Sequence, residues 1–244
     1  MTGDSATELA HTAWPDVPPD ALVLLPVGST EQHGPHLPLD TDSVIAHAVA
    51  RRAATALPGT LVAPTLPYGA SGEHAGFPGT VSIGHEALRA VLVELVRSLS
   101  LWAARIVLVN GHGGNTATLD TTVRLLRAEG HDVAWTGCSV LGGDAHAGRA
   151  ETSVMLHLAP ERVRLAAAVT GDTRPLSVLL PELMAHGVHA ISPSGVLGDP
   201  TGATAKEGRT AMDAMVSAAV RRIAAWGVDD RGRLTEPVHE AVRP

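Results

Sequence analysis

The chain has 244 residues, of which 45% are hydrophobic and 18% are charged, a composition typical of a globular fold with a sizeable core. No shift in composition marks a second domain, so we expect one α/β domain over residues 1–244, with peripheral or partly disordered tails at 1–18 and 228–244. The formal net charge of −7, without any basic stripe, excludes a general nucleic-acid binder.

Apolar runs typical of buried strands alternate along the chain with segments of helical apolar spacing. Many glycines and prolines predict loops over residues 170–204. The alternation favours a three-layer α/β/α fold with a mostly parallel sheet covered on both faces. In chain order, we expect a strand at 21–27, a helix at 41–57, a strand at 61–63, a helix at 85–101, a strand at 105–109, a helix at 116–129, a strand at 133–137, and helices at 149–158 and 205–226.

Targeting signals and disulfides are not expected. Residues 1–5 lack the charged and apolar regions of a signal peptide, and no apolar run approaches the ~20 residues that cross a bilayer. The single cysteine, Cys138, cannot form an internal disulfide and is expected to be a small buried residue. We therefore expect a cytoplasmic protein that does not bind a membrane.

The first polar cluster follows the predicted strand 21–27 and contains Glu31, His33 and Asp42. Glu31 and His33 are two residues apart, so both side chains can point the same way in an extended segment. Asp42, at a helix start, can turn back toward them. Imidazole and carboxylate donors suit zinc, manganese or iron, and a carboxylate can bridge two ions. Capping of the helix by Asp42 is the alternative, but capping does not explain the histidine.

The second cluster follows the predicted strand 105–109, where glycines flank His112 in the loop 110–115. Glycine lets the backbone approach a metal or substrate closely. A glycine-rich turn before a helix can also cradle a phosphate, although this loop lacks the lysine and the serine or threonine of a P-loop. His112 is thus a metal ligand in one interpretation and a spectator in a non-enzymic phosphate-binding module in the other.

Two further loops carry titratable side chains. Glu151 falls in the first turn of the predicted helix 149–158, where its charge favours the helix dipole. His146 lies five residues earlier, and its ordinary pKa near neutrality suits proton transfer. Glu73 and His74 lie in a glycine-rich loop at 71–80, which either walls a substrate pocket or is purely structural.

These four clusters, in this order, resemble the creatininase family of metal-dependent amidohydrolases. The resemblance spans roughly residues 20–220 and implies a creatininase-like domain that binds one or two divalent ions per chain, Zn, Fe(II) or Mn. It also implies a closed homo-oligomer, such as a hexamer. The matching segments are PVGSTEQHGPHLPLDTD (26–42), GEHAGFPGT (72–80), VNGHGGN (109–115) and HAGRAETS (146–153).

The resemblance implies ligand roles for particular residues. Positions matching Glu31, Asp42 and His112 hold one ion in the family. Positions matching His33 and Asp42 hold the second ion, so that Asp42 bridges the two.

The chain departs from the family pattern at two places. Creatininases complete the second ligand set with a glutamate at the position of Gly114, so Glu151 is our candidate for the missing carboxylate. Creatininases also carry a tryptophan shortly before the position of His146, where this chain has Leu-Gly-Gly at 141–143. Creatinine is therefore not the expected substrate.

Two segments, 144–158 and 195–204, are similar to a peptidase of this family that releases a C-terminal Val-Tyr dipeptide from a modified ribosomal precursor peptide. This resemblance implies that a metal-activated water hydrolyses that amide bond in a short precursor peptide. His146 would deliver a proton to the departing nitrogen, and Glu73 or His74 would orient the substrate. The alternative is a deformylase or amidohydrolase acting on a small formylamino-pyrimidine or cyclic amide.

Overall fold

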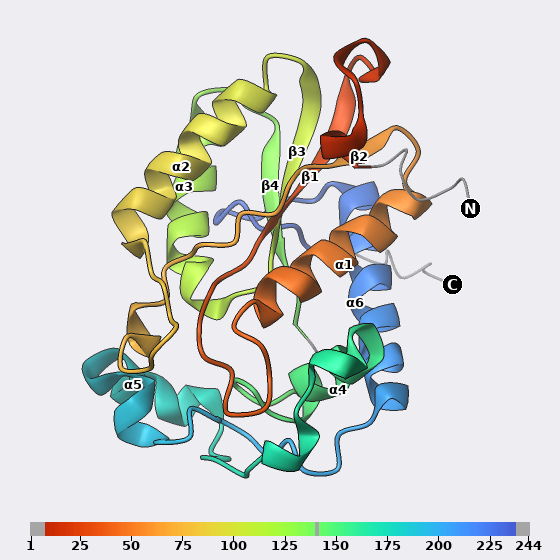
Figure 1. Cartoon of the computed structure of the whole chain (residues 1–244). Helices are drawn as coiled ribbons and strands as arrows, with labels where there is room; N and C mark the ends of the chain where they lie inside the picture. The colour runs from red at the N-terminus through yellow and green to blue at the C-terminus, as the bar shows by residue number, and fades with distance from the viewer. Residues whose placement is uncertain (1–7, 140–141, 238–244) are drawn as a thin grey trace, which may run out of the picture.

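Four parallel strands form the central sheet of the computed structural model, which describes residues 8–139 and 142–237. The strands β1 (Ala21–Val27), β2 (Thr60–Val62), β3 (Ala103–Asn110) and β4 (Val133–Gly137) lie in the order β2-β1-β3-β4 (Figure 1). The chain runs from β1 outward to β2 and then returns to β3 on the other side of β1. Open parallel sheets bind ligands beyond the carboxyl ends of their strands at such a reversal of order.

Helices cover both faces of this sheet, as Figure 1 shows. Alternate strand residues face opposite layers: Leu24 and Val107 pack on one side, and Val23 and Leu108 pack on the other. Because both faces are buried, the strands are continuous apolar runs. The predicted three-layer α/β/α fold is confirmed. The first layer contains α1 (Thr41–Ala56), α4 (Arg149–Leu158) and α6 (Ala205–Ala225), and the second contains α2 (Gly84–Leu99) and α3 (Thr116–Ala128).

A helix lies where only loops were expected. Helix α5 (Leu176–Ile191) falls within residues 170–204, so the prediction of loops is wrong over that part. Pro181 lies inside α5, and Gly187, with φ of 73°, kinks it. Both residues disfavour helix by local rules, but the buried side chains of Leu179 and Leu183 anchor the helix in a small apolar cluster. The kinked helix packs on residues 72–74, which belong to a predicted site loop.

Short 3-10 helices complete the described part of the chain. None of the helices in residues 8–139 and 142–237 has both the length and the apolar character required to cross a bilayer. The 3-10 helices are η1 (Leu9–His11), η2 (Trp14–Asp16), η3 (Gly72–His74), η4 (Gly113–Asn115), η5 (Pro160–Arg162) and η6 (Leu165–Ala167).

The last described residues pair with the edge strand of the sheet. The Trp135 amide donates to the Gly232 carbonyl at 3.0 Å, and the Leu234 amide donates to the Trp135 carbonyl at 2.8 Å. Leu234 is buried. Some predictions fall outside the described residues. Residues 1–7 and 238–244 of the expected tails are among them, as are residues 1–5, which were judged to lack a signal peptide. Leu141, in the segment 141–143 that lacks the family tryptophan, also lies outside.

Candidate metal centre

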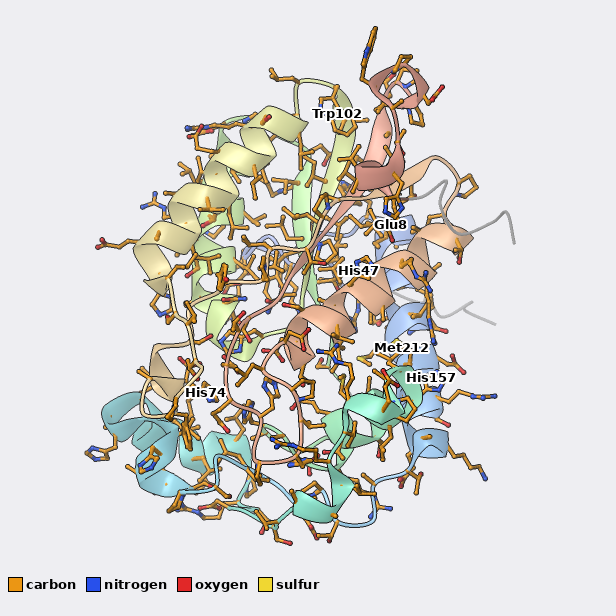
Figure 2. All side chains as sticks on the ribbon, in the orientation of Figure 1. Glu8, His47, His74, Trp102, His157 and Met212 are labelled. Atoms are coloured by element: carbon orange, nitrogen blue, oxygen red, sulfur yellow. The ribbon has the colours of Figure 1, made fainter. Side chains whose placement is uncertain are left out.

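The predicted site residues gather at the carboxyl ends of β1 and β3. Glu31 and His33 follow β1 and His112 follows β3, so the reversal of strand order brings the two loops together. Figure 2 shows His74 at the end of the molecule opposite Trp102, which directly precedes β3. The cluster therefore lies at the end of the sheet where parallel α/β proteins bind ligands.

Asp42 lies between two histidines, with one carboxylate oxygen facing each. Its Oδ1 is 3.2 Å from Nε2 of His33, and its Oδ2 is 3.2 Å from Nδ1 of His112. The Ser29 hydroxyl donates to Oδ2 at 2.7 Å, which helps to hold this orientation. Only 3% of the Asp42 side chain is exposed, although it is the second residue of α1. The helix start thus directs this carboxylate into the cluster.

Two sets of donor atoms share Asp42. Glu31, Asp42 and His112 form one set, and His33, Asp42 and Glu151 form the other; within each set the donor atoms lie within 4.8 Å of one another. A carboxylate shared by two sets of imidazole and carboxylate donors suits two divalent ions.

The carboxylate of Glu31 is buried without a conventional hydrogen bond. Glu31 is 0% exposed, and neither of its carboxylate oxygens accepts a hydrogen bond of good geometry from residues 8–139 or 142–237. The imidazoles of His112 and His74 lie 3.2 and 3.4 Å from its Oε1. A buried charge needs a compensating charge or ligand, or the fold loses on the order of several kcal/mol. A divalent cation fits this requirement.

The two predicted histidine ligands are oriented by backbone carbonyls. Nδ1 of His33 is 3.1 Å from the carbonyl oxygen of Glu31, and Nε2 of His112 is 3.1 Å from that of Ala70. Because a carbonyl only accepts, each of these nitrogens carries a hydrogen. The opposite nitrogens, Nε2 of His33 and Nδ1 of His112, face the cluster. Metal-binding histidines typically have this second hydrogen bond.

The charges of the cluster favour bound cations. Burial would raise the pKa of Glu31, but the positive charge of His112 lowers it to about 2. Burial would lower the pKa of His33, but the charge of Asp42 raises it to about 10. Burial likewise opposes the ionisation of Asp42, yet His33 brings its pKa well below the ordinary value. Protons on the imidazoles and a metal ion therefore compete for the same atoms.

Two further histidines line the cluster, and burial favours the neutral form of each. Nδ1 of His146 is 3.8 Å from Oε1 of Glu31, and a third donor set joins Glu31, His33 and His146. Burial lowers the pKa of His74 to about 4 and that of His146 well below its ordinary value. A neutral imidazole beside a hydrolytic centre can accept and return a proton.

Glu73 fills the space that a side chain at position 114 would take. A Cβ on Gly114 would lie 2.4 Å from Oε1 of Glu73 and 2.4 Å from Nε2 of His112. The same Glu73 oxygen is 3.5 Å from Nε2 of His112. Gly114 therefore leaves room for a carboxylate that arrives from another loop. Burial raises the pKa of Glu73.

Glu151 contacts both its own helix start and the cluster. Its Oε2 accepts a hydrogen bond from the Ala147 amide at 2.7 Å and lies 3.9 Å from Nε2 of His33. The side chain is 28% exposed, but its carboxyl end is turned inward, and burial raises its pKa to about 7. Every residue predicted for the site thus lies in or beside the cluster, and the individual roles remain predictions.

Sequence analysis did not single out Ser29 or Gln32, although both belong to the cluster. Ser29 binds Asp42, and the Gln32 amide lies between His74 and His146. The only signal in the sequence was that both are polar residues in a segment that follows a buried strand. The partner of Ser29 is 13 positions away, whereas the partners of Gln32 lie in loops 42 and 114 positions away in the chain.

The surroundings of His112 argue against the phosphate-binding interpretation of the loop 110–115. The carboxylates of Glu31 and Asp42 both lie 3.2 Å from its Nδ1. A phosphate bound there would meet two buried negative charges, and repulsion between like charges is strong in a poorly solvated site. The loop is therefore better suited to a cation.

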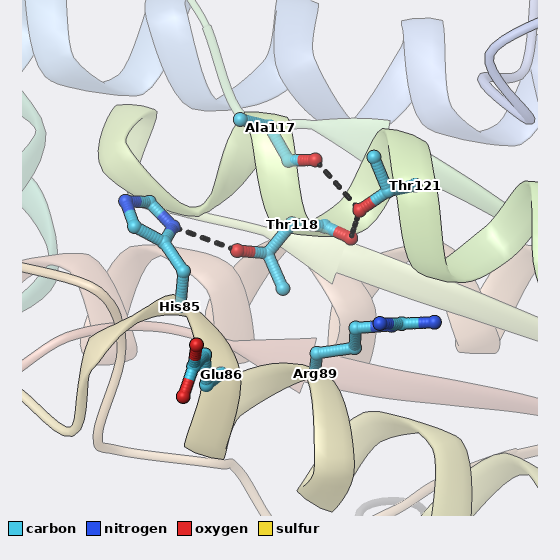
Figure 3. A pocket seen from close by; sticks show the side chains of 6 residues that line it. All are labelled: His85, Glu86, Arg89, Ala117, Thr118 and Thr121. Carbon is cyan, nitrogen blue, oxygen red and sulfur yellow. Dashed lines mark hydrogen bonds between the residues drawn. The ribbon is translucent and has the colours of Figure 1, made fainter.

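A shallow groove between the first turns of α2 and α3 is separate from this cluster (Figure 3). The His85 ring and the Thr118 hydroxyl lie 2.8 Å apart across it. None of the predicted site residues lines the groove, so the buried cluster remains the candidate centre. The lining residues are His85, Glu86, Arg89, Ala117, Thr118 and Thr121.

Comparison with known proteins places this architecture in one family. The family described as Creatininase, creatinine amidohydrolase, matches residues 10–223. A mycofactocin precursor peptide peptidase from Mycobacterium ulcerans (strain Agy99) is 53% identical over 241 residues, covering 96% of this chain and 94% of that protein. A 2-amino-5-formylamino-6-ribosylaminopyrimidin-4(3H)-one 5'-monophosphate deformylase from Methanothermobacter thermautotrophicus is 38% identical, covering 66% of this chain and 64% of that protein.

A solved structure described as creatininase Mn superposes with a TM-score of 0.72 at 28% identity, covering 88% of this chain and 96% of that one. The fold and the sequence comparisons therefore agree. The chain belongs to the creatininase family.

Proposed function

We propose that this chain is a metal-dependent peptidase that hydrolyses an amide bond near the carboxyl terminus of the mycofactocin precursor peptide and releases its Val-Tyr dipeptide. The observation that carries the proposal is the buried pair of donor sets sharing Asp42. The 53% identity to a mycofactocin precursor peptide peptidase, over nearly the whole of both chains, supports the substrate.

The proposed ligands are Glu31, Asp42 and His112 for one ion and His33, Asp42 and Glu151 for a second. When bound, a divalent ion supplies Lewis acidity, which activates water and polarises an amide carbonyl. Mixed carboxylate and imidazole donors suit Zn, Mn and Fe(II) alike.

The residues of the chain supply proton transfer and orientation. His146 turns its Nδ1 toward Glu31. In this position Nδ1 can accept a proton from the attacking water and pass it to the departing nitrogen. His74 and Glu73 come from η3, whereas Glu151 comes from α4. From η3 these two side chains can contact the substrate. The centre is thus built from at least four separate loops and helix starts.

Replacing His146 with alanine is expected to slow turnover by about 10²–10⁴-fold, the usual contribution of a general acid or base. The metal content should stay unchanged, because the two donor sets that share Asp42 do not include His146. Steady-state kinetics and elemental analysis measure the two effects, with His157→Ala in α4 as the matched control. Loss of metal from His146→Ala protein would instead make His146 a ligand.

Replacing Glu151 with glutamine is expected to reduce the bound metal from about two ions to about one per chain, because one of the two donor sets loses its second carboxylate. Elemental analysis of extensively dialysed protein measures this. Glu207→Gln is the control. Glu207 lies in α6 at the protein surface and pairs with Arg149 of α4, the helix that carries Glu151. Unchanged stoichiometry would assign the second carboxylate elsewhere, with Glu73 next to be tested.

The proposed reaction is tested by incubating the metal-loaded protein with a decarboxylated precursor peptide that ends in Val-Tyr. Mass spectrometry should show loss of the dipeptide, and none should occur after treatment with a chelator. An intact peptide, together with turnover of a formylamino-pyrimidine, would instead favour the deformylase alternative.

The proposal extends to assembly and location. Helix α5 exposes Leu176, Val178 and Met184, with Met184 81% exposed, which suits burial against another subunit of a closed homo-oligomer. Cys138 is the only cysteine, which suits a reducing cytoplasm. Light scattering would detect the oligomer and its mass.

A further inference from the structure

The side-chain amide of Gln32 lies between two histidines of the centre. Gln32 is 5% exposed. Its Nε2 is 2.8 Å from Nδ1 of His74, 3.1 Å from Nε2 of His146 and 3.1 Å from the carbonyl oxygen of Gly195. Its Oε1 accepts a hydrogen bond from the Gly34 amide at 2.8 Å. One neutral side chain therefore contacts two of the groups that could move protons.

Two backbone groups determine which way this amide is turned. The Gly34 N–H can only donate, so the atom that it contacts must be the oxygen of Gln32. The Gly195 carbonyl can only accept, so the atom that it contacts must be the nitrogen. A flipped amide would place donor against donor and acceptor against acceptor. The nitrogen of Gln32 thus has one hydrogen left for a histidine.

His146 cannot take that hydrogen. Its Nε2 is 2.8 Å from the backbone oxygen of Gln32, so this nitrogen must carry a hydrogen and donate it. A bare Nε2 would set one lone pair against another at that distance. The other ring nitrogen, Nδ1, is then bare in the neutral ring, and it faces Glu31 and the metal cluster.

His74 takes the remaining hydrogen of the Gln32 amide. Its Nδ1 must be bare to accept at 2.8 Å, so its own hydrogen is on Nε2. That Nε2 lies 3.4 Å from Oε1 of Glu31. His74 therefore turns an N–H toward the centre, whereas His146 turns a lone pair toward it.

We propose that Gln32 is a positioning residue that holds both histidines in the Nε2–H tautomer, His146 through its backbone oxygen and His74 through its side-chain amide. His146 then presents a proton acceptor to the centre, and His74 presents a proton donor. Gly195 makes this contact possible, because a Cβ there would lie 1.9 Å from Oε1 of Gln32. The significance of the tautomers for hydrolysis rests on the proposed function, but the tautomers themselves do not.

The tautomers are measured directly by nitrogen NMR on the zinc-loaded full chain with ¹⁵N-labelled histidine. Signals are assigned by their loss in His74→Asn and His146→Asn proteins. Both rings should show a hydrogen on Nε2 and none on Nδ1, whatever the substrate is. A hydrogen on Nδ1 of either ring would overturn the proposal without affecting the peptidase assignment.

Two substitutions test the effect on catalysis. Gln32→Met keeps the length of the side chain without its hydrogen bonds, and Gln32→Glu keeps its shape but cannot donate to His74. Each should lower kcat by about 10–100-fold, the usual cost of losing a partner that orients a group at a metal site, with a smaller change in KM. The ¹⁵N signals of His74 should change at the same time.

The matched control is Thr30→Val, which removes a hydrogen bond from the same loop to the Pro67 carbonyl without contacting either histidine. It should keep both the wild-type kcat and the wild-type tautomers. An unchanged kcat in folded Gln32→Met protein would overturn the positioning role. If both Gln32 variants fail to fold, the wild-type spectrum alone still decides the tautomers.

Discussion

Replacing Asp42 with alanine is expected to abolish metal binding and to lower kcat/KM by about 10³-fold or more, since the metal contributes several kcal/mol to transition-state stabilisation. Asp42 belongs to both proposed ligand sets, so its loss affects both ions at once. Each other ligand belongs to only one of these two sets. Elemental analysis and steady-state kinetics measure the two losses.

The Asp42→Ala protein should remain folded, which circular dichroism can verify. The sheet and the apolar layers of α1, α4 and α6 do not depend on this side chain. Asp40→Ala is the control: Asp40 lies two residues earlier, has 42% of its side chain exposed and pairs with Arg162. A folded, metal-free Asp42→Ala protein with full turnover would refute the metal centre.

The strands could be predicted closely because each is buried on both faces. The predicted segments 21–27 and 133–137 coincide with β1 and β4, since a strand covered by helices on both sides must be apolar throughout. Helix α5 could not be predicted in the same way. Pro181 and Gly187 are correct local signals for an interruption, and only the tertiary contacts of Leu179 and Leu183 outweigh them.

Part of the site could also be predicted, because the resemblance to the creatininase family implied that Glu31 and His112 hold one ion. The parallel sheet gives the physical reason: residues that follow parallel strands meet at one end of the sheet, which brings these two side chains together although they are 81 positions apart in the chain. Contacts between loops had no such rule. Glu73 fills the space beside Gly114 because of the course that two loops take. No periodic pattern in the sequence describes that course.

Gln32 shows the same limit in another form. Its neighbours Glu31 and His33 can be recognised in the sequence as candidate metal ligands, because carboxylates and imidazoles bind metals. The amide of Gln32 has no such metal affinity that would single it out. Its partners His74 and His146 come from η3 and from the loop before α4. A role that consists of orienting other side chains becomes visible only when those side chains are in place.

Removing the metal with a chelator is expected to abolish turnover while leaving the protein folded near neutral pH. Protonated His33 and His112 can then neutralise the buried carboxylates, since both imidazoles have raised pKa values. Re-addition of Zn²⁺ or Mn²⁺ should restore activity and raise Tm, because a ligand that binds only the folded state stabilises it.

The stripped protein should also lose stability as the pH rises. The pKa of His33 is about 10 in the folded chain and ~6.5 in an unfolded one. A raised pKa in the folded state stabilises fully below ~6.5, and this contribution disappears as the pH approaches 10. We expect the Tm of stripped protein to fall by ~5–10 °C between pH 7 and pH 10, if a few kcal/mol are lost.

Metal-loaded protein should show a smaller fall over the same range, because a divalent ion holds the imidazoles unprotonated throughout. Thermal unfolding of the two forms in parallel, followed by circular dichroism, separates this effect from the titration of surface groups, which both forms share. Equal slopes in the two forms would mean that the cation and the protons do not compete for His33 and His112.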